Sequence, residues 1–491
     1  MLGPDEPRYA AIGLQMARSG DYVMPVLWGK AWFEKPPLLY WMTAAGSRVG
    51  LDSDLAPRLP VALLSVSFLI FFFAVLRREF GARAALFAAA MLATSAGWLG
   101  YSHIAVTDLP LSATFSAGML LLLRPDVSWR RAALSGVLFG LAVLAKGLVP
   151  FVLMLPALWF LRRNIRAIAA MLGVAIAVAS PWYVAMYARA GRVFIDDFIW
   201  KHHFERFASD ALQHVQPWWY YVPVLLAGLV PWTPLAALLR RQTFADSRAR
   251  FLLAWFLWGL VFFSASRNKL PGYVLPLLPA AAALFGIALD ATRRAWAVLA
   301  ACALLAYLFP IAEGVLPIAL VTGIRRAGVQ FPWMPLLPVI ALVIAAAVLE
   351  LRNHRVAATM LVSAGVVVTT AHFVVTSFPV LDRTVSARQV WQKASGKSGQ
   401  PCVASSGLTF RYGLNYYFGF EVPDCTGAAG ELPLRAGSAD FLSSAWISGG
   451  GANVESGTSA LYFMSDSSTS ISWPAAFSVV LCGSSTPSTG R

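Results

Sequence analysis

The chain has 491 residues, of which 58% are hydrophobic and 13% are charged, and its formal net charge is +15. A soluble domain of this length needs many more charged side chains to cover its surface, so lipid must be the solvent for much of the chain. The positive charge by itself would suit a nucleic-acid-binding protein, but the arginines lie in pairs between apolar runs, which excludes that class. The composition therefore predicts an all-α polytopic membrane protein.

The first 58 residues precede every long apolar run and carry two unusual charged motifs. In DEPRYA, Asp5 suits the N-cap of a helix and Pro7 suits its first turn, so an amphipathic helix is expected to follow and to end at Gly20. In WFEKPPLLYW, the two prolines force Lys35 into an extended conformation, so the side chains of Glu34 and Lys35 are expected to point in different directions. The aromatic residues around this motif suit the membrane interface.

Long apolar runs then predict about twelve membrane spans. The runs are Leu59–Leu76, Ala82–Gly100, Leu109–Leu123, Ala132–Ala145, Leu148–Leu161, Ala167–Tyr187, Trp219–Leu239, Phe251–Phe263, Pro271–Leu289, Ala295–Ala312, Trp333–Leu349 and Ala357–Thr376. Several runs are short or contain proline. Such spans need tilt or protein neighbours to satisfy their backbone groups.

Arginines follow alternate spans, which is the pattern of cytoplasmic loops. They are Arg77-Arg78, Arg130-Arg131, Arg162-Arg163, Arg240-Arg241, Arg293-Arg294, Arg352 and Arg355, and Arg325-Arg326 breaks the alternation. This pattern predicts that residues 1–58, the loop at Asp108, the loops at 188–218 and 264–270, and the C-terminal tail all lie on the opposite, outer face. Every lysine falls on that predicted face: Lys30, Lys35, Lys146, Lys201, Lys269, Lys393 and Lys397.

The chain has three predicted parts. Residues 1–58 form an outer loop, residues 59–376 form the membrane domain, and residues 377–491 form an outer C-terminal domain. Stretches such as ALYFMSDS and SVVLCG predict strands, so the last part is expected to be a small α/β or β-rich domain with a disordered tail. A disulfide between Cys402 and Cys425 is compatible with an oxidising outer compartment and would leave one tail cysteine unpaired.

Two carboxylates and four lysines of the outer face form the main candidate site. Asp5 and Asp108 each lie at a predicted helix start, so capping explains them as local structure, but such carboxylates are also well placed for acid–base chemistry. The lysines would suit an anionic substrate, most simply one that carries phosphate. They are Lys35, Lys146, Lys201 and Lys269. The alternative is that each lysine only extends from the membrane toward water.

Two further motifs add candidate ligands. KHHFERF contains His203 and Arg206, and the Arg206 guanidinium suits phosphate because it can donate two parallel hydrogen bonds. The imidazoles of this stretch, together with Glu34, would suit a divalent metal ion, although their spacing matches no strong metal motif. SRNKLPGY places Lys269 and Tyr273 where a predicted span re-enters the membrane, which suits a lipid head group.

Several of these motifs resemble one enzyme family. DEPRYAAIGLQMARSGDYVMPVLWGKAWFEKPPLLYW, VTDLPL, AKGLVP, PWWYYVP and NKLPGYVLP are similar to motifs of the aminoarabinose (ArnT-like) transferases that modify lipid A. These belong with the protein O-mannosyltransferase relatives that have the GT-C fold. The similarity follows the membrane domain through about Pro279. It implies a glycosyltransferase that takes a sugar from a polyprenyl-phosphate carrier at the periplasmic face of a bacterial inner membrane.

The resemblance also assigns roles to residues. It implies that Asp5 and Asp108 are catalytic, and that Glu34 and Lys35 lie beside the carrier phosphate. The residues expected to bind substrate are Glu6, Glu34, Lys35, His203, Arg206, Lys269 and Tyr273. Glu34 and His203 are the candidates for a metal site. The partners implied are a polyprenyl-phosphate sugar, an acceptor that is lipid A or another glycan or protein, and the bilayer, but no nucleic acid.

The sequence departs from the family pattern in one respect. The family begins with a transmembrane helix ahead of the Asp-Glu motif, and here that helix is missing, which fits a start codon placed too late or a fragment. The sugar, aminoarabinose-like or a hexose, and the acceptor stay open. The alternatives from other classes are a transporter or flippase for a lipid-linked sugar, and a protein that binds the carrier without catalysis. A transporter would more often carry ionisable residues deep within its spans.

Overall fold

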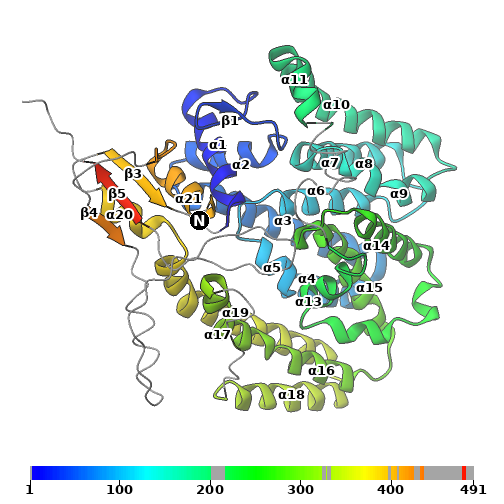
Figure 1. Ribbon diagram of the computed structural model, residues 1–491. Coiled ribbons are helices and arrows are strands. Elements are labelled where there is room, and N and C mark those ends of the chain that lie inside the picture. The colour runs from blue at the N-terminus through cyan, green and yellow to red at the C-terminus, as the bar shows by residue number, and fades with distance from the viewer. Residues whose placement is uncertain are drawn as a thin grey trace, which may run out of the picture. The chain divides into compact units, whose positions relative to one another are not determined.

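The computed structural model describes residues 3–198, 200, 216–322, 328, 333–395, 400–405, 408–424, 432–435 and 478–482. Helices dominate these residues (Figure 1), which confirms the predicted all-α membrane class. The chain divides into two compact units. The smaller unit comprises residues 1–11, 308–335 and 368–491, and the larger unit comprises residues 12–307 and 336–367.

The first helix of the N-terminal region is the one that the DEPRYA motif predicts. α1 (Asp5–Ser19) is the expected amphipathic helix, and it ends just before Gly20, whose φ is 73°. β1 (Val26–Leu27) and β2 (Lys30–Ala31) form a short hairpin, and α2 (Leu38–Arg48) begins directly after the two prolines. In the larger unit α1 packs closely on α2, because a Cβ added to Gly13 would lie 2.5 Å from the Cβ of Thr43.

The membrane helices of the larger unit follow in chain order (Figure 1). They are α3 (Leu55–Phe80), α4 (Ala82–Ala93), α5 (Ala96–Tyr101), α6 (Asp108–Leu121), α7 (Trp129–Lys146), α8 (Val149–Leu153), α9 (Leu155–Phe160), α10 (Ile165–Ala190), α11 (Arg192–Phe194), α13 (Tyr221–Gly228), η2 (Thr233–Leu238), η3 (Arg241–Phe244), α14 (Ser247–Ala265), η4 (Pro271–Leu277), α15 (Leu278–Ala291), α16 (Trp296–Leu305) and α18 (Leu336–Leu351). α19 (Arg355–Thr384) begins in this unit and continues into the smaller one.

Six helices of the described chain are long and apolar enough to cross a membrane by length and composition. They are Leu55–Phe80, Ile165–Ala190, Ser247–Ala265, Pro271–Ala291, Trp296–Leu316 and Arg355–Arg383. Each coincides with a predicted span, and the other predicted runs form shorter or broken helices. The run after Gly81, for example, is divided between α4 and α5 because Thr94 and Ser95 donate hydroxyl hydrogen bonds back to Ala90 O (2.6 Å) and Leu92 O (3.0 Å).

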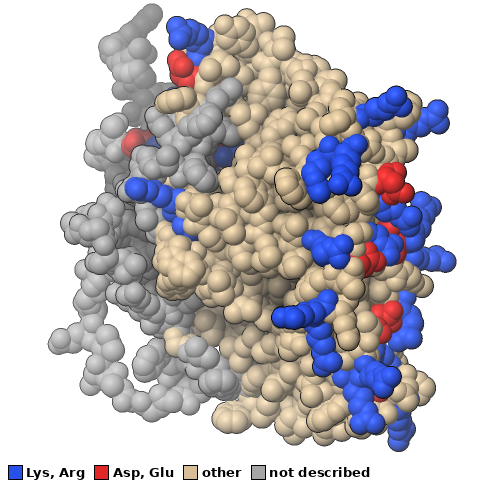
Figure 2. All heavy atoms as spheres, turned by 90° about the vertical axis from the view of Figure 1, so that its right-hand side faces the viewer, with Lys and Arg blue, Asp and Glu red and all other residues tan. Residues whose placement is uncertain are grey.

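The helix ends that carry arginine meet in a network around one buried carboxylate. Glu79, near the end of α3, contacts Arg124 at 2.7 Å, Arg131 at 3.4 Å and Arg248 at 3.3 Å. We call these four residues the arginine network. They come from α3, the α6–α7 connection, α7 and α14, and of these arginines the sequence pattern had singled out only Arg131. Lysine and arginine side chains line one edge of the face in Figure 2, beside a broad uncharged band.

A second buried ion pair fixes the same end of the last helices. Arg355 at the start of α19 donates through Nε to the Glu350 carboxylate at 3.0 and 3.1 Å, and through Nη1 to the carbonyls of Leu289 and Thr292 at 2.8 and 2.6 Å. Glu350 also accepts from the backbone N–H of Ala295 at 3.1 Å. These contacts tie the α15–α16 connection to the α18–α19 connection and satisfy carbonyls left by the end of α15.

The smaller unit contains α17 (Leu308–Thr322), the end of α19, and a compact C-terminal part. That part has α20 (Arg388–Ser395), β3 (Gln400–Ser405), α21 (Leu408–Phe418), β4 (Leu432–Arg435) and β5 (Ser478–Cys482). The strands form an antiparallel sheet in the order β3-β5-β4. Within the predicted stretch SVVLCG, the described residues Ser478–Cys482 form a strand, whereas ALYFMSDS and the final SSTPSTGR lie outside the described residues. Cys402 is disulfide-bonded, and its expected partner Cys425 also lies outside the described residues.

Candidate functional site

The first site cluster is built around Asp108, at the end of the larger unit away from the arginine network. Asp108 is the first residue of α6 and Lys146 is the last residue of α7, so the antiparallel helices bring both to one end. Lys146 Nζ lies 2.5 Å from Asp108 Oδ1 and 4.5 Å from the centroid of the Tyr273 ring. The ammonium is thus held between a carboxylate and an aromatic face. We call Asp108, Lys146, Gly272 and Tyr273 the Asp108 cluster.

Gly272 lets the backbone of η4 approach this carboxylate. A Cβ at Gly272 would lie 2.5 Å from Asp108 Oδ1 and 2.8 Å from the Tyr101 hydroxyl. No side chain fits in that space without moving Asp108. The glycine therefore brings Tyr273 and the start of η4 into contact with the ends of α6 and α7.

The Asp108–Lys146 pair is arranged to position the lysine. Both side chains are mostly buried, with 16% and 12% of their surfaces exposed. A buried ion pair of this kind fixes the position of both groups. The arrangement suits Asp108 to hold Lys146 in place for an anionic substrate.

Glu34 and Lys35 form a second buried pair on the segment before α2. Lys35 Nζ lies 3.1 Å from Glu34 Oε1, and the two side chains are 11% and 12% exposed. The expectation that they point in different directions is therefore wrong. The chain bends at Glu34 and Lys35, both side chains are long enough to turn toward each other, and burial makes an unpaired charge costly.

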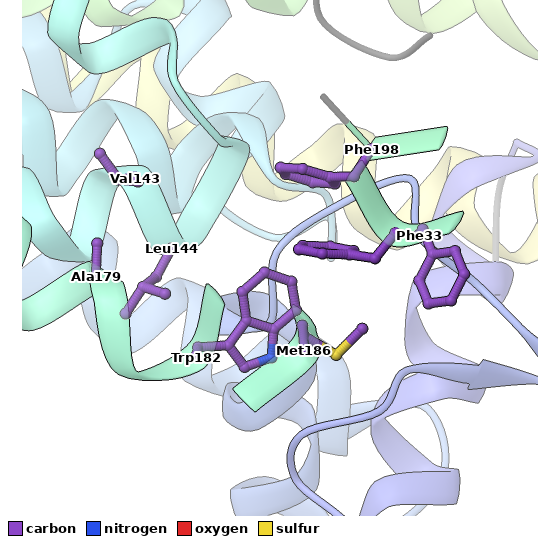
Figure 3. Packing of buried hydrophobic residues seen from close by; sticks show 8 residues of the cluster. Phe33, Val143, Leu144, Ala179, Trp182, Met186 and Phe198 are labelled. Atoms are coloured by element: carbon purple, nitrogen blue, oxygen red, sulfur yellow. The ribbon is translucent and has the colours of Figure 1, made fainter. Parts of the chain in front are cut away.

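An aromatic cluster connects this segment to the ends of α7 and α10. Phe33, beside Glu34, packs edge-to-face on Phe194 at 5.8 Å between ring centroids, and Phe194 also contacts Trp182 at 5.7 Å and stacks on Phe198 at 5.3 Å. Figure 3 shows Phe33 and Phe198 from one side and Trp182 and Met186 of α10 from the other, with Val143 and Leu144 of α7 beyond them.

Both candidate pairs are attached to this aromatic cluster. Phe33 directly precedes the Glu34–Lys35 pair, and Leu144 lies two residues before Lys146. Apolar packing of this kind fixes the backbone to which each pair is attached. The cluster therefore packs the residue before Glu34 together with the end of α7 that carries Lys146.

The segment between α1 and β1 is also fixed to α10 and α2. Val23 O accepts from Trp182 Nε1 at 3.0 Å, and Tyr22 O accepts from Trp41 Nε1 at 2.8 Å. Asp21 pairs with Arg189 at 2.6 Å. Partial burial alone would raise the pKa of Asp21, but hydrogen bonds from two backbone N–H groups and from Arg189 outweigh it and lower the pKa below its usual value.

The Lys269 side chain is buried and hydrogen-bonded to backbone carbonyls. It is 4% exposed, and its ammonium donates to Gln216 O at 3.0 Å and to Ser266 O. Burial lowers the pKa of Lys269 below its usual value. These contacts fasten residue 216 to the turn between α14 and η4, so they favour a role in loop placement. The assignment of Lys269 to a phosphate stays a prediction.

In the smaller unit, Asp5 opens α1 and pairs with Arg8 one turn later. Asp5 is the more exposed of the two, with 43% of its side chain accessible, whereas Glu6 is buried. Sequence reasoning missed Arg8, although its position three residues after an acidic helix start is a recognisable signal. Tyr101 and Gly272 were missed as well, because only the fold brings them to Asp108.

Two predicted ligands lie outside the described residues: His203 and Arg206. The rest of that motif, with Lys201, His202, Glu205 and His214, lies there too. Among the residues that the structure describes, no group of three His, Cys, Asp or Glu side chains is arranged to hold a metal ion. A metal site formed by Glu34 and His203 therefore stays a prediction.

Comparisons with known proteins show which enzymes the chain resembles. Residues 34–187, which include Glu34, Lys35, Asp108 and Lys146, match the family described as dolichyl-phosphate-mannose-protein mannosyltransferase. The structure is similar to the crystal structure of ArnT from Cupriavidus metallidurans bound to undecaprenyl phosphate, with a TM-score of 0.72, 25% identity, and coverage of 99% of this chain and 94% of that one. The chain is thus similar in fold to ArnT over nearly its whole length.

Curated relatives are similar to part of the chain. The chain is 36% identical over 304 residues to undecaprenyl phosphate-alpha-4-amino-4-deoxy-L-arabinose arabinosyl transferase 2 of Pseudomonas fluorescens, which covers 58% of this chain and 52% of that protein. The corresponding transferase of Photorhabdus laumondii is 30% identical over 294 residues, covering 56% of this chain and 53% of that protein. The chain thus spans about half the length of the curated relatives that it matches.

Proposed function

We propose that the protein transfers a sugar, aminoarabinose-like or a hexose, from a polyprenyl-phosphate carrier to lipid A or another acceptor. The reaction would take place at the periplasmic face of a bacterial inner membrane. The names of the curated relatives support the donor and the reaction type. The solved ArnT structure bound to undecaprenyl phosphate, which covers nearly the whole chain, supports the carrier.

The observation that carries the proposal is the pair of buried carboxylate–ammonium contacts on one packed region. Lys146 is held by Asp108 at 2.5 Å and Lys35 is held by Glu34 at 3.1 Å. A carrier phosphate gains negative charge when the glycosidic bond breaks, and an ammonium that is already in place stabilises that charge without rearrangement. Buried lysines held in place by acidic neighbours meet this requirement.

The acidic motif at the start of α1 supplies the remaining chemistry. For a hydroxyl acceptor, Asp5 acts as general base and takes the proton as the oxygen attacks the sugar. For a phosphate acceptor, which is ionised at neutral pH, Asp5 instead orients the acceptor or stabilises the positive charge on the sugar. Lys35 and Arg206 hold the carrier phosphate, while Asp108 holds Lys146 in position. Carrier phosphate leaves with the electron pair of the broken bond.

One observation speaks for the transporter alternative. Glu313 on α17 accepts hydrogen bonds from His372, at 2.9 Å, and from Thr376, so a polar cluster lies on apolar helices. However, His372 lies about 25 Å along α19 from Arg355, which is near the far edge of a hydrocarbon core about 30 Å thick. Transporter sites are expected near the midplane. The cluster is better explained as hydrogen bonding between helices.

The test uses the purified full chain in detergent or nanodiscs. Undecaprenyl-phosphate aminoarabinose and lipid A are supplied together, and the acceptor is analysed by mass spectrometry. We expect the mass of one added sugar, and we expect Asp5→Asn to abolish the product while undecaprenyl phosphate still binds. Absence of product with this donor and with polyprenyl-phosphate hexoses would overturn the proposal. Transbilayer movement of the donor without product would favour the transporter.

A further inference from the structure

We infer that Tyr412, in the C-terminal part of the chain, is a positioning residue that acts on Asp5 through Arg8. This inference rests on the proposed function and deepens it. The three residues belong to the smaller unit. Tyr412 lies beyond the stretch in which the sequence motifs resemble the family, and Arg8 was not among the predicted site residues.

The contacts form a chain from the ring to the carboxylate. The guanidinium of Arg8 lies over the Tyr412 ring, with 5.1 Å between Cζ and the ring centroid. Its Nε donates to Pro4 O at 3.0 Å, and its terminal nitrogen pairs with Asp5 Oδ1. A planar group held by an aromatic face and by a hydrogen bond along its edge has one orientation. The ring thereby sets the direction from which Arg8 engages Asp5.

The charge and exposure of these groups fit a positioning role. Arg8 is 15% exposed, so its rotation is restricted, whereas Asp5 is 43% exposed. Arg8 engages Oδ1, and a carboxylate fixed through one oxygen keeps the other in a defined direction for a substrate. Without the ring, Arg8 gains alternative rotamers, and the carboxylate loses its fixed orientation.

Tyr412 lies on a rigid support. It belongs to α21, whose Phe410 and Leu414 pack with Val390 of α20 and Val403 of β3 in one apolar core. The neighbouring Arg411 pairs with Asp424 at 2.7 Å and donates to Val422 O at 3.1 Å. The support matters because a mobile ring would not restrict the guanidinium.

The test compares two substitutions of Tyr412 in the full chain. Tyr412→Leu removes the aromatic face and is expected to lower kcat about tenfold, the range of a partly buried cation–π contact, with an unchanged KM for the undecaprenyl-phosphate sugar. Tyr412→Phe keeps the face and should restore kcat to near the wild-type value. The matched control is Tyr417→Leu, which removes a ring of α21 that stacks on Trp391 at 5.6 Å instead of on Arg8.

A double-mutant cycle separates positioning from simple destabilisation. If Tyr412 acts through Arg8, Tyr412→Leu causes no further loss of kcat in an Arg8→Met background. Additive losses, equal losses in Tyr412→Leu and Tyr417→Leu, or wild-type kcat in Tyr412→Leu would each overturn the inference. An inactive wild-type protein would instead overturn the proposed function, so the two failures are distinguishable.

Discussion

The two ends of the larger unit both bury ion pairs, but they build them from different residues. At one end the arginine network surrounds Glu79 with three guanidinium groups, and Arg355 divides its donors between Glu350 and backbone carbonyls. At the other end, lysines pair with carboxylates in Asp108–Lys146 and Glu34–Lys35. Arginine offers five donors in a fixed fork, whereas lysine offers a compact charge on a flexible stem.

The difference teaches how one bundle separates stability from binding. When a buried carboxylate pairs with several guanidinium groups, removal of any partner lowers the stability of the protein, so the carboxylate has a structural role. An ammonium held by a carboxylate can turn toward an incoming phosphate while it keeps its charge. The comparison therefore predicts that substitutions at the arginine end lower stability and that substitutions at the lysine end lower binding or turnover.

The largest expected effect on stability comes from Glu79→Gln. The side chain is 4% exposed, and the change leaves three guanidinium groups around a neutral amide, so we expect a loss of about 3 kcal/mol. The thermal midpoint of the protein in detergent measures this loss. As a control, Asp290→Asn removes a pair with Arg83, which is 60% exposed, and should change the midpoint little. Equal shifts in the two variants would break the comparison.

Asp108→Asn is expected to lower turnover about 100-fold, because Lys146 loses the carboxylate that holds it in place. Sugar transfer to lipid A and the thermal midpoint are measured together. We expect a smaller midpoint shift than for Glu79→Gln. A variant that unfolds as readily as Glu79→Gln, but turns over normally while folded, would assign Asp108 to stability instead.

A substitution of Gly272 tests whether the position of the Asp108 carboxylate matters. Gly272→Ala places a Cβ 2.5 Å from Asp108 Oδ1 and should also lower turnover. Gly100→Ala is the matched control, since nothing lies within 4 Å of its added Cβ. Similar losses of turnover in both alanine variants would show that the close approach at Gly272 has no special role.

Lys35→Ala tests whether the lysine end of the larger unit binds the carrier. Removal of this ammonium should weaken the binding of undecaprenyl phosphate about tenfold, the worth of one hydrogen bond to a charged group. Binding is measured by titration of purified protein in nanodiscs, with Lys30→Ala, in the exposed strand β2, as the control. A normal Kd with reduced turnover would contradict the assignment of Lys35 to the carrier phosphate.

The smallest effect concerns Lys269, a lysine without a carboxylate partner among its described contacts. Burial lowers its pKa in the folded protein below the usual 10.5. Between the folded and unfolded pKa values the unfolded chain binds more protons, so stability rises slightly with pH in that alkaline window. The rise should be absent in Lys269→Met, as measured by thermal midpoints across pH. Identical pH profiles would show that the burial has no energetic consequence.

Much of the fold follows from local sequence signals. Hydropathy predicts the spans, the two prolines predict the break before α2, and the alternation of charge predicts which helix ends carry arginine. Each of these signals lies within a short stretch of the sequence. The helix break at Thr94 and Ser95 was harder to predict from the sequence, because a hydroxyl that hydrogen-bonds to its own helix also occurs in unbroken helices. The span Ala82–Gly100 therefore divides into two helices where the apolar run gives no sign of it.

The candidate site was predictable in part. Asp108 and Lys146 were placed on one face by span counting, but their contact depends on how α6 and α7 pack. The Glu34–Lys35 pair was misjudged because backbone direction says little about the ends of long side chains. Gly272 and Tyr412 required the fold, since each acts on a residue far away in the sequence.

The span Pro271–Ala291 is almost wholly enclosed by protein, and it begins with η4, which carries Tyr273. A 3-10 segment is tolerated at that depth because neighbouring helices, and not acyl chains, surround its backbone. Tyr273 is consequently insulated from changes in bilayer thickness that would tilt the outer helices. Turnover measured in short-chain and long-chain lipid should vary less than the thermal midpoint does.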